Sequence, residues 1–193
     1  YEGTKAAPGL TEWEVGTSSA DVDQDPEQLG PAYLGSNPAI ANRAADATQR
    51  AVTFLGSNVD NATTAFADVT GLSFAVESGK RYHFKFVIWY DVPVNTTGSA
   101  WGVNGPAGLL RMNKVQSLTA TSNTFANAVT TFDAPAAANA SSAAAAGNRC
   151  VMEGTFVPSA SGSLIARFKS EVAASNVSAR AHFSYVEWFE TLV

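Results

Sequence analysis

The chain has 193 residues, 46% of them hydrophobic, with a formal net charge of −5 and a pI of about 4.9. That is enough chain for one large domain, or for one domain with its own core plus an arm. The acidic balance argues against a nucleic-acid partner, because such proteins present a basic surface. No apolar run approaches the roughly 20 residues of a transmembrane helix, so we expect no membrane insertion.

The first 48 residues differ in composition from the rest. They are rich in Gly, Pro, Ser and acidic residues, show no sustained helical or strand period, and contain too few large apolar residues to bury a core. We predict that residues 1–48 form an extended acidic arm that docks on a partner, with one short Ala-rich helix near residues 39–50. The candidate docking side chains are Leu10, Trp13, Val15, Leu29, Tyr33 and Leu34.

Residues 49–193 have the pattern of an all-β domain. Strand candidates follow one another as AVTFLG, TTAFADV, LSFAVE, RYHFKFVIWYDV, AWGVNG, GLLRMNKV and SLTATSNTFANAVTTFDAP, and turns rich in Asn, Asp, Gly and Ser separate several of them. Gly79 can supply a positive φ in the turn between Glu77 and Lys80.

The later part of this domain continues the pattern. The Ala-rich stretch 134–149 predicts a loop, because Pro135 and Gly147 interrupt it. RCVMEGTFVPSASGSLIARFKSEV predicts a hairpin, and SNVSARAHFSYVEWFETLV predicts a terminal strand. Many short strands with Gly- and Ser-rich turns predict an antiparallel β-sandwich or jelly roll, preceded by the extended arm.

RYHFKFVIWYDV, residues 81–92, is the most informative strand. Alternation places five large residues on one face, which we predict to be the core: Tyr82, Phe84, Phe86, Ile88 and Tyr90. The opposite face begins polar and becomes apolar at Val87 and Trp89. A solvated sheet face does not need a Trp there, so we expect a neighbouring subunit or a loop to cover it.

The aromatic residues of the domain allow three interpretations. They can belong to the core, to a homo-oligomer interface, whose centre favours Trp, Tyr and Phe, or to a platform on which sugar rings stack. Core plus oligomer interface accounts best for the pattern, and the interface candidates are Trp89, Val87, Trp101 and Trp188.

No motif for catalysis, metal or cofactor stands out. Cys150 is the only cysteine and reads as a small buried hydrophobe. His83 and His182 lack the spacing of a metal site, and the acidic stretch ADVDQDPEQ lacks the Gly and Glu that a calcium loop requires. The paired acids Glu187 and Glu190 lie at the end of one strand, which is poor evidence for glycoside hydrolysis. We therefore expect no catalytic residues, no metal and no cofactor.

Several ordered motifs resemble those of a known family. TTAFADVTGLSFAVESGKRYHFKFVIWYD, TGSAWGVNGPAG and EGTFVPSASGSLIARFKSEVAASNVSARAHFSYVEWFE resemble a domain that recurs at the C-terminus of tailed-bacteriophage virion proteins. The resemblance covers roughly residues 55–190. It implies a β-sandwich or jelly-roll module that is usually trimeric and has no enzymatic activity.

The sequence thus leads to one hypothesis and its rivals. The expected function is that of a virion structural protein, a head decoration or spike protein at the particle surface. Its expected partners are two further copies of itself and the major capsid protein or other virion proteins. A tail fibre would need a longer shaft. The rivals are a module that binds a receptor or a host surface glycan through Trp89, Trp101 and loops near Asn95 and Asn104, and, least favoured, a polysaccharide-degrading enzyme.

Overall fold

The structure, a computed structural model, describes residues 50–191. The chain divides into two units between Ala47 and Thr48, and the described residues belong to the second. The predicted docking side chains from Leu10 to Leu34 and the predicted helix, apart from its last residue, lie outside the described residues.

Residues 50–191 form eleven β-strands and no helix, which confirms the all-β prediction. The strands are β1 (Ala51–Phe54), β2 (Val59–Asn61), β3 (Ala67–Val76), β4 (Arg81–Asp91), β5 (Ser99–Asn104), β6 (Gly108–Thr119), β7 (Ser122–Val129), β8 (Asn148–Pro158), β9 (Gly162–Ser170), β10 (Val177–Ala179) and β11 (Tyr185–Thr191).

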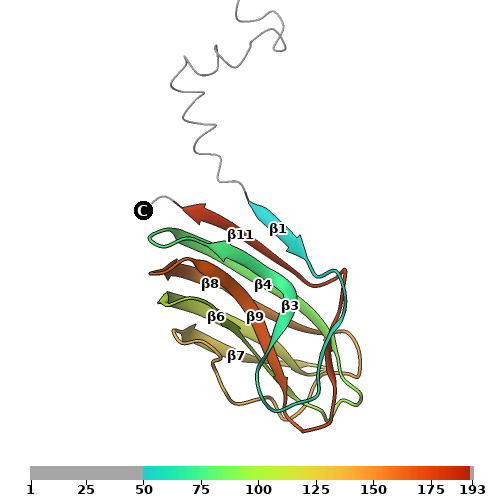
Figure 1. Cartoon of the computed structure of the whole chain (residues 1–193). Coiled ribbons are helices and arrows are strands. Elements are labelled where there is room, and N and C mark those ends of the chain that lie inside the picture. Colours follow the sequence, from blue (N-terminus) through green and yellow to red (C-terminus); the bar gives the residue numbers. More distant parts are fainter. Residues whose placement is uncertain (1–49, 192–193) are drawn as a thin grey trace, which may run out of the picture. The chain divides into compact units, whose positions relative to one another are not determined.

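Two antiparallel sheets make up the sandwich (Figure 1). The larger has eight strands: six lie side by side in the order β1-β11-β4-β8-β6-β7, while β10 also pairs with β4 and β2 pairs with β10. The smaller sheet has the order β3-β9-β5. The predicted β-sandwich is therefore confirmed.

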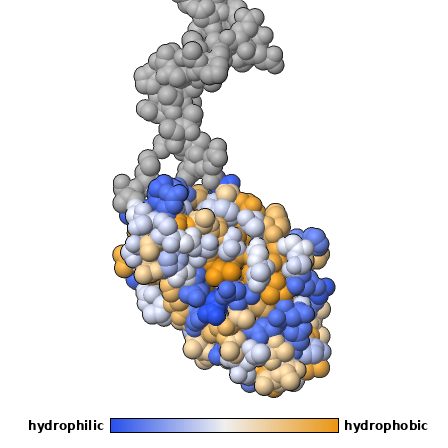
Figure 2. Space-filling model, viewed as in Figure 1, coloured by the Kyte–Doolittle hydropathy of each residue, from blue (hydrophilic) through white to orange (hydrophobic). Residues whose placement is uncertain are grey.

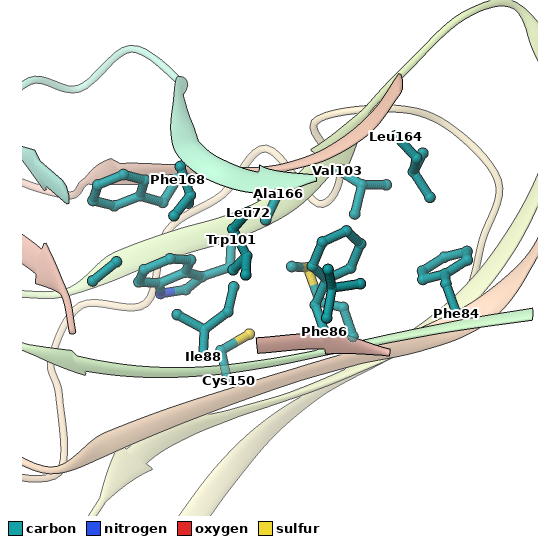
Figure 3. Packing of buried hydrophobic residues seen from close by; sticks show 14 of the residues in the cluster. Leu72, Phe84, Phe86, Ile88, Trp101, Val103, Cys150, Leu164, Ala166 and Phe168 are labelled. Atoms are coloured by element: carbon teal, nitrogen blue, oxygen red, sulfur yellow. The ribbon is translucent and has the colours of Figure 1, made fainter. Parts of the chain in front are cut away.

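Alternating side chains of β4 supply much of the core. The residues predicted to face inward, Tyr82 to Tyr90, are each exposed by 5% or less. They meet residues of the small sheet such as Val103, Leu164 and Phe168 in one cluster (Figure 3). At about 25 cal/mol for each Å² of apolar surface removed from water, this shared interior is the main force that holds the two sheets together.

The connections between the sheets differ from two expectations. TTAFADV and LSFAVE contribute to a single strand, β3, whose register shifts between Asp68 and Ser73; there Gly71 adopts a φ of 93° that most side chains avoid. The predicted hairpin of β8 and β9 is wrong. These strands pair with β4 and β6 in one sheet and with β3 and β5 in the other. The alternation of apolar and polar residues does not predict which of the two sheets a strand belongs to.

The Ala-rich loop, residues 130–147, runs along the open edge of β5. The Asp133 backbone N–H donates to the carbonyl of Val103, and that of Asn139 donates to the carbonyl of Ser99, both over 2.9–3.0 Å. All but the last residue of β5 are buried, so this strand has no solvated face. The loop prediction is confirmed for residues 134–147, whereas Asn148 and Arg149 belong to β8; the loop also occupies the edge of the small sheet.

Candidate functional site

The most distinctive surface is the outer face of the large sheet, the side turned away from β3, β9 and β5. Antiparallel pairing aligns residues of one face into rows that cross the strands. On β4 the outward residues are His83, Lys85, Val87 and Trp89, and each belongs to a different row.

One row is apolar across all six strands. Its members stand opposite one another in register from β1 to β7: Phe54, Tyr185, Val87, Val151, Val115 and Phe125. The rings of Phe54 and Tyr185 are in contact, with centroids 5.4 Å apart. We call these six residues the apolar row.

The apolar row is covered at its centre and open at both ends. Val87 is only 2% exposed, because Tyr185 and Val151 flank it on the same face. Phe54 and Phe125 are 59% and 64% exposed. The two ends of the row therefore leave aromatic surface in water, and a molecule that covered either end would gain the free energy of burying it.

Trp89 lies two residues along β4 from the apolar row. It is 37% exposed, and the guanidinium of Arg149, its partner on β8, stands 5.8 Å from the ring centroid. Its backbone N–H donates to Ser184 Oγ, which fixes this end of the strand against the turn before β11. Trp89 is therefore half open, as an interface candidate should be.

On the other side of the apolar row the outer face becomes polar. Lys85 lies 3.5 Å from Glu153, and Arg50 lies 3.6 Å from Glu187. These pairs are partly or largely exposed and contribute at most about 1 kcal/mol each. The next row contains Arg111, Thr155, His83 and Phe189, with the His83 and Phe189 rings stacked 5.0 Å apart.

These polar rows line a depression of about 580 Å³, a size that suits a small ligand. Its walls include positively charged Arg50, Lys85 and Arg111 and negatively charged Glu153 and Glu187. Within residues 50–191 no carboxylate pairs with Arg111. The depression can therefore donate and accept hydrogen bonds, as a polar ligand such as a saccharide requires.

Figure 2 shows the surface from the side of Figure 1. Apolar and hydrophilic patches alternate there, and no single kind covers the whole of that side. Among the described residues no three His, Cys, Asp or Glu side chains gather as metal ligands, and no helix is long and apolar enough to cross a membrane.

Lys114 and Cys150 are two buried titratable groups beneath β5. Lys114 is 2% exposed and its Nζ donates to the carbonyl of Trp101 over 3.2 Å; burial lowers its pKa. Burial raises the pKa of the Cys150 thiol to about 12. The thiol therefore stays protonated at neutral pH, so it is not an activated nucleophile.

The Cys150 thiol should weaken the fold in alkali. Between pH 9 and about 12 the unfolded chain loses the thiol proton that the folded chain keeps, so the contribution of Cys150 to stability falls as the pH rises. Burial also raises the pKa of Tyr90, which adds a loss in the same direction above pH 10. From pH 7.5 to 10.5 we expect Cys150→Ala to lose about 2 kcal/mol less than the unsubstituted protein. Urea unfolding at both pH values measures this, and equal losses would contradict it.

The structure separates the four interface candidates. Trp89 lies on the outer face, and Val87 lies in the covered centre of the apolar row. Trp101 is fully buried in the core, and Trp188 packs its ring on Phe74 at 4.7 Å on the inner face. Trp101 is therefore corrected to a residue of the domain's own core, whereas Trp188 is half-buried against that core.

Other sequence predictions change as well. His182 belongs to the stretch predicted as a terminal strand, but it lies in the turn before β11 with a φ of 66°, outside any strand. Phe54, Val151, Val115 and Phe125 were missed as surface residues. Alternation within each strand marks them as sharing a face, but the register that aligns them joins strands far apart in the sequence.

No protein-family model matches the chain, and no similar curated protein is found. Its function is therefore inferred from the sequence motifs and from the geometry of the outer face.

Proposed function

We propose that this chain is a non-enzymatic structural protein of a bacteriophage particle, a head decoration or spike protein. In this proposal the β-sandwich forms a homotrimer, and residues 1–48 dock on the major capsid protein or another virion protein at the particle surface. The sequence motifs support the class of protein. The observation that carries the role in assembly is the apolar row, exposed at Phe54 and Phe125.

The physical reason is the burial of apolar surface. A partner that covers the row removes aromatic surface from water at about 25 cal/mol per Å², and aromatic residues are enriched at the centres of protein interfaces. Trp89 with its Arg149 neighbour extends this surface along β4. Three copies in one assembly bring three arms to the particle, which strengthens binding without any new kind of contact.

Particle binding tests the proposal. Val115→Lys places a charge in the apolar row, which should weaken assembly of the three copies whose arms bind the particle. We therefore expect the full-length variant to bind about tenfold or more weakly to particles that were produced without this protein. Co-sedimentation with those particles measures the effect. Leu109→Lys is the matched control, because Leu109 lies on the same strand and face, is 76% exposed and is not part of the row. Wild-type chain that fails to bind the particles would contradict the proposed function.

A receptor- or glycan-binding module is the second candidate, and the depression between Arg111 and Phe189 is the observation that favours it. Trp101 no longer supports it, because this side chain is buried. A glycan array probed with the purified full chain separates the two candidates: saturable glycan binding without particle binding favours the receptor module.

A further inference from the structure

The six-strand path of the large sheet ends in β1 and β7, and each pairs on one side only within residues 50–191; off this path the three-residue strand β2 pairs only with β10. β1 pairs with β11 and β7 pairs with β6 (Figure 1). The unpaired side of an edge strand presents backbone N–H and C=O groups that can pair with a strand of another chain.

The two edges of the small sheet are protected. The Ala-rich loop occupies the edge of β5 through hydrogen bonds to Ser99 and Val103. β3 is bent by its register shift and carries Asp68 at its start. Bulges, charges and covering loops are the usual devices that prevent unwanted strand pairing.

β7 has little of this protection. Residues 115–132 contain no charged residue and no proline, and Thr, Val and Phe favour strands. Phe125 stands exposed in the middle of β7, where a charged residue would discourage pairing. Only Ala128, which has a positive φ near the end of the strand, interrupts the extended backbone of β7. From Ser122 to Asn127 the edge is open to a partner strand.

We propose that β7 of one copy pairs with β1 of a second copy, head to tail, so that the large sheets join into a closed ring. The number of copies, three, rests on the proposed function, but the contact itself does not. Head-to-tail contacts use two different surfaces of each copy, and they form a closed ring when the rotation from one copy to the next closes. The apolar row offers two such surfaces, one at Phe54 and one at Phe125.

The strand directions fit this contact. Every neighbouring pair from β1 to β7 is antiparallel, so the six strands alternate in direction and β1 runs opposite to β7. Rotation about an axis parallel to the strands keeps each strand's direction. A copy placed beside β7 by such a rotation presents β1 antiparallel to it, and the ladder continues without a change of pattern.

The side-chain pattern fits as well. Residues directly opposite each other in a sheet share a face, so outward Phe125 must meet an outward residue of β1. Placing Phe125 opposite Phe54 of the neighbouring copy joins the two exposed rings and extends the apolar row from copy to copy. The same register places Asn127 opposite Val52, which is 48% exposed.

Cysteine cross-linking of the full chain tests the contact. We expect the double variant Val52→Cys with Asn127→Cys to form covalent oligomers up to a closed ring under mild oxidation, because facing residues of paired strands suit a disulfide. Each single variant should stay monomeric on a non-reducing gel. Cys150 is buried and does not interfere. A monomeric double variant, or a covalent dimer of Phe125→Cys alone, would overturn the proposal.

Charge variants give a second readout in the isolated protein. Phe125→Lys and Phe54→Lys should each raise the dissociation constant of the assembly about tenfold or more in mass photometry, while Leu109→Lys should not. Circular dichroism confirms that each variant is folded. If neither variant changes the dissociation constant, the proposed contact is wrong, but the proposed virion role is not affected. If cross-linked rings form but do not bind particles, the proposed virion role is wrong and the proposed contact is supported.

Discussion

Replacing Trp101 with alanine is expected to lower the free energy of unfolding by about 3–5 kcal/mol. The side chain is fully buried and its ring stacks on Phe168, with centroids 4.7 Å apart. It also lies 5.0 Å from the ring of Tyr90, and its Nε1 donates to Ser99 Oγ over 3.0 Å. Alanine leaves a large cavity between the two sheets and removes one of the two donors to Ser99 Oγ, the other being Gln116 Nε2.

Trp89→Ala is the matched control, because the same substitution is made where the ring is 37% exposed. We expect it to cost about 1 kcal/mol or less. Chemical unfolding followed by far-UV circular dichroism measures both values without relying on tryptophan fluorescence. Equal losses in the two variants would mean that Trp101 does not hold the sheets together.

Replacing Gly98 with alanine is expected to detach the Ala-rich loop from β5. A Cβ at this position would lie 1.6 Å from the carbonyl oxygen of Asn139, so one of the two backbones must move. The hydrogen bonds from Asn139 to Ser99 and from Ser142 to Asn95 are then lost. Strain and lost hydrogen bonds together should cost about 3 kcal/mol.

Hydrogen exchange followed by mass spectrometry locates this effect. In Gly98→Ala the amides of Asn139 and Ser142 should exchange faster, while those of β4 keep their protection relative to global stability. Gly56→Ala is the control, since no atom lies within 4 Å of its added Cβ. If the loop amides of Gly98→Ala exchange no faster than those of Gly56→Ala, the loop does not depend on the absence of a Cβ.

The sequence predicts the parts of the fold that depend on neighbouring residues. Alternation in RYHFKFVIWYDV identifies the inner face of β4, and Gly79 marks the turn before it, where it adopts a φ of 81°. These features follow from strand geometry and from the freedom of glycine. They needed no knowledge of which strands pair.

The candidate site was harder to predict because it depends on distant pairing. Trp89 and Trp101 both read as strand tryptophans, yet one lies on the outer face and the other in the core. The difference arises because one face of β5 packs against the large sheet and the Ala-rich loop is hydrogen-bonded along its free edge. The apolar row likewise exists only after six strands adopt one register.

The Ala-rich loop also affects the order in which the chain can fold. The loop comes after β6 and β7 in the sequence, so the edge of β5 stays open until residues 133–142 have been synthesised and placed. Contacts between distant segments form slowly, and open strand edges associate with other chains. Refolding yield should therefore fall as the protein concentration rises, because another chain can pair with β5 before this segment covers its edge.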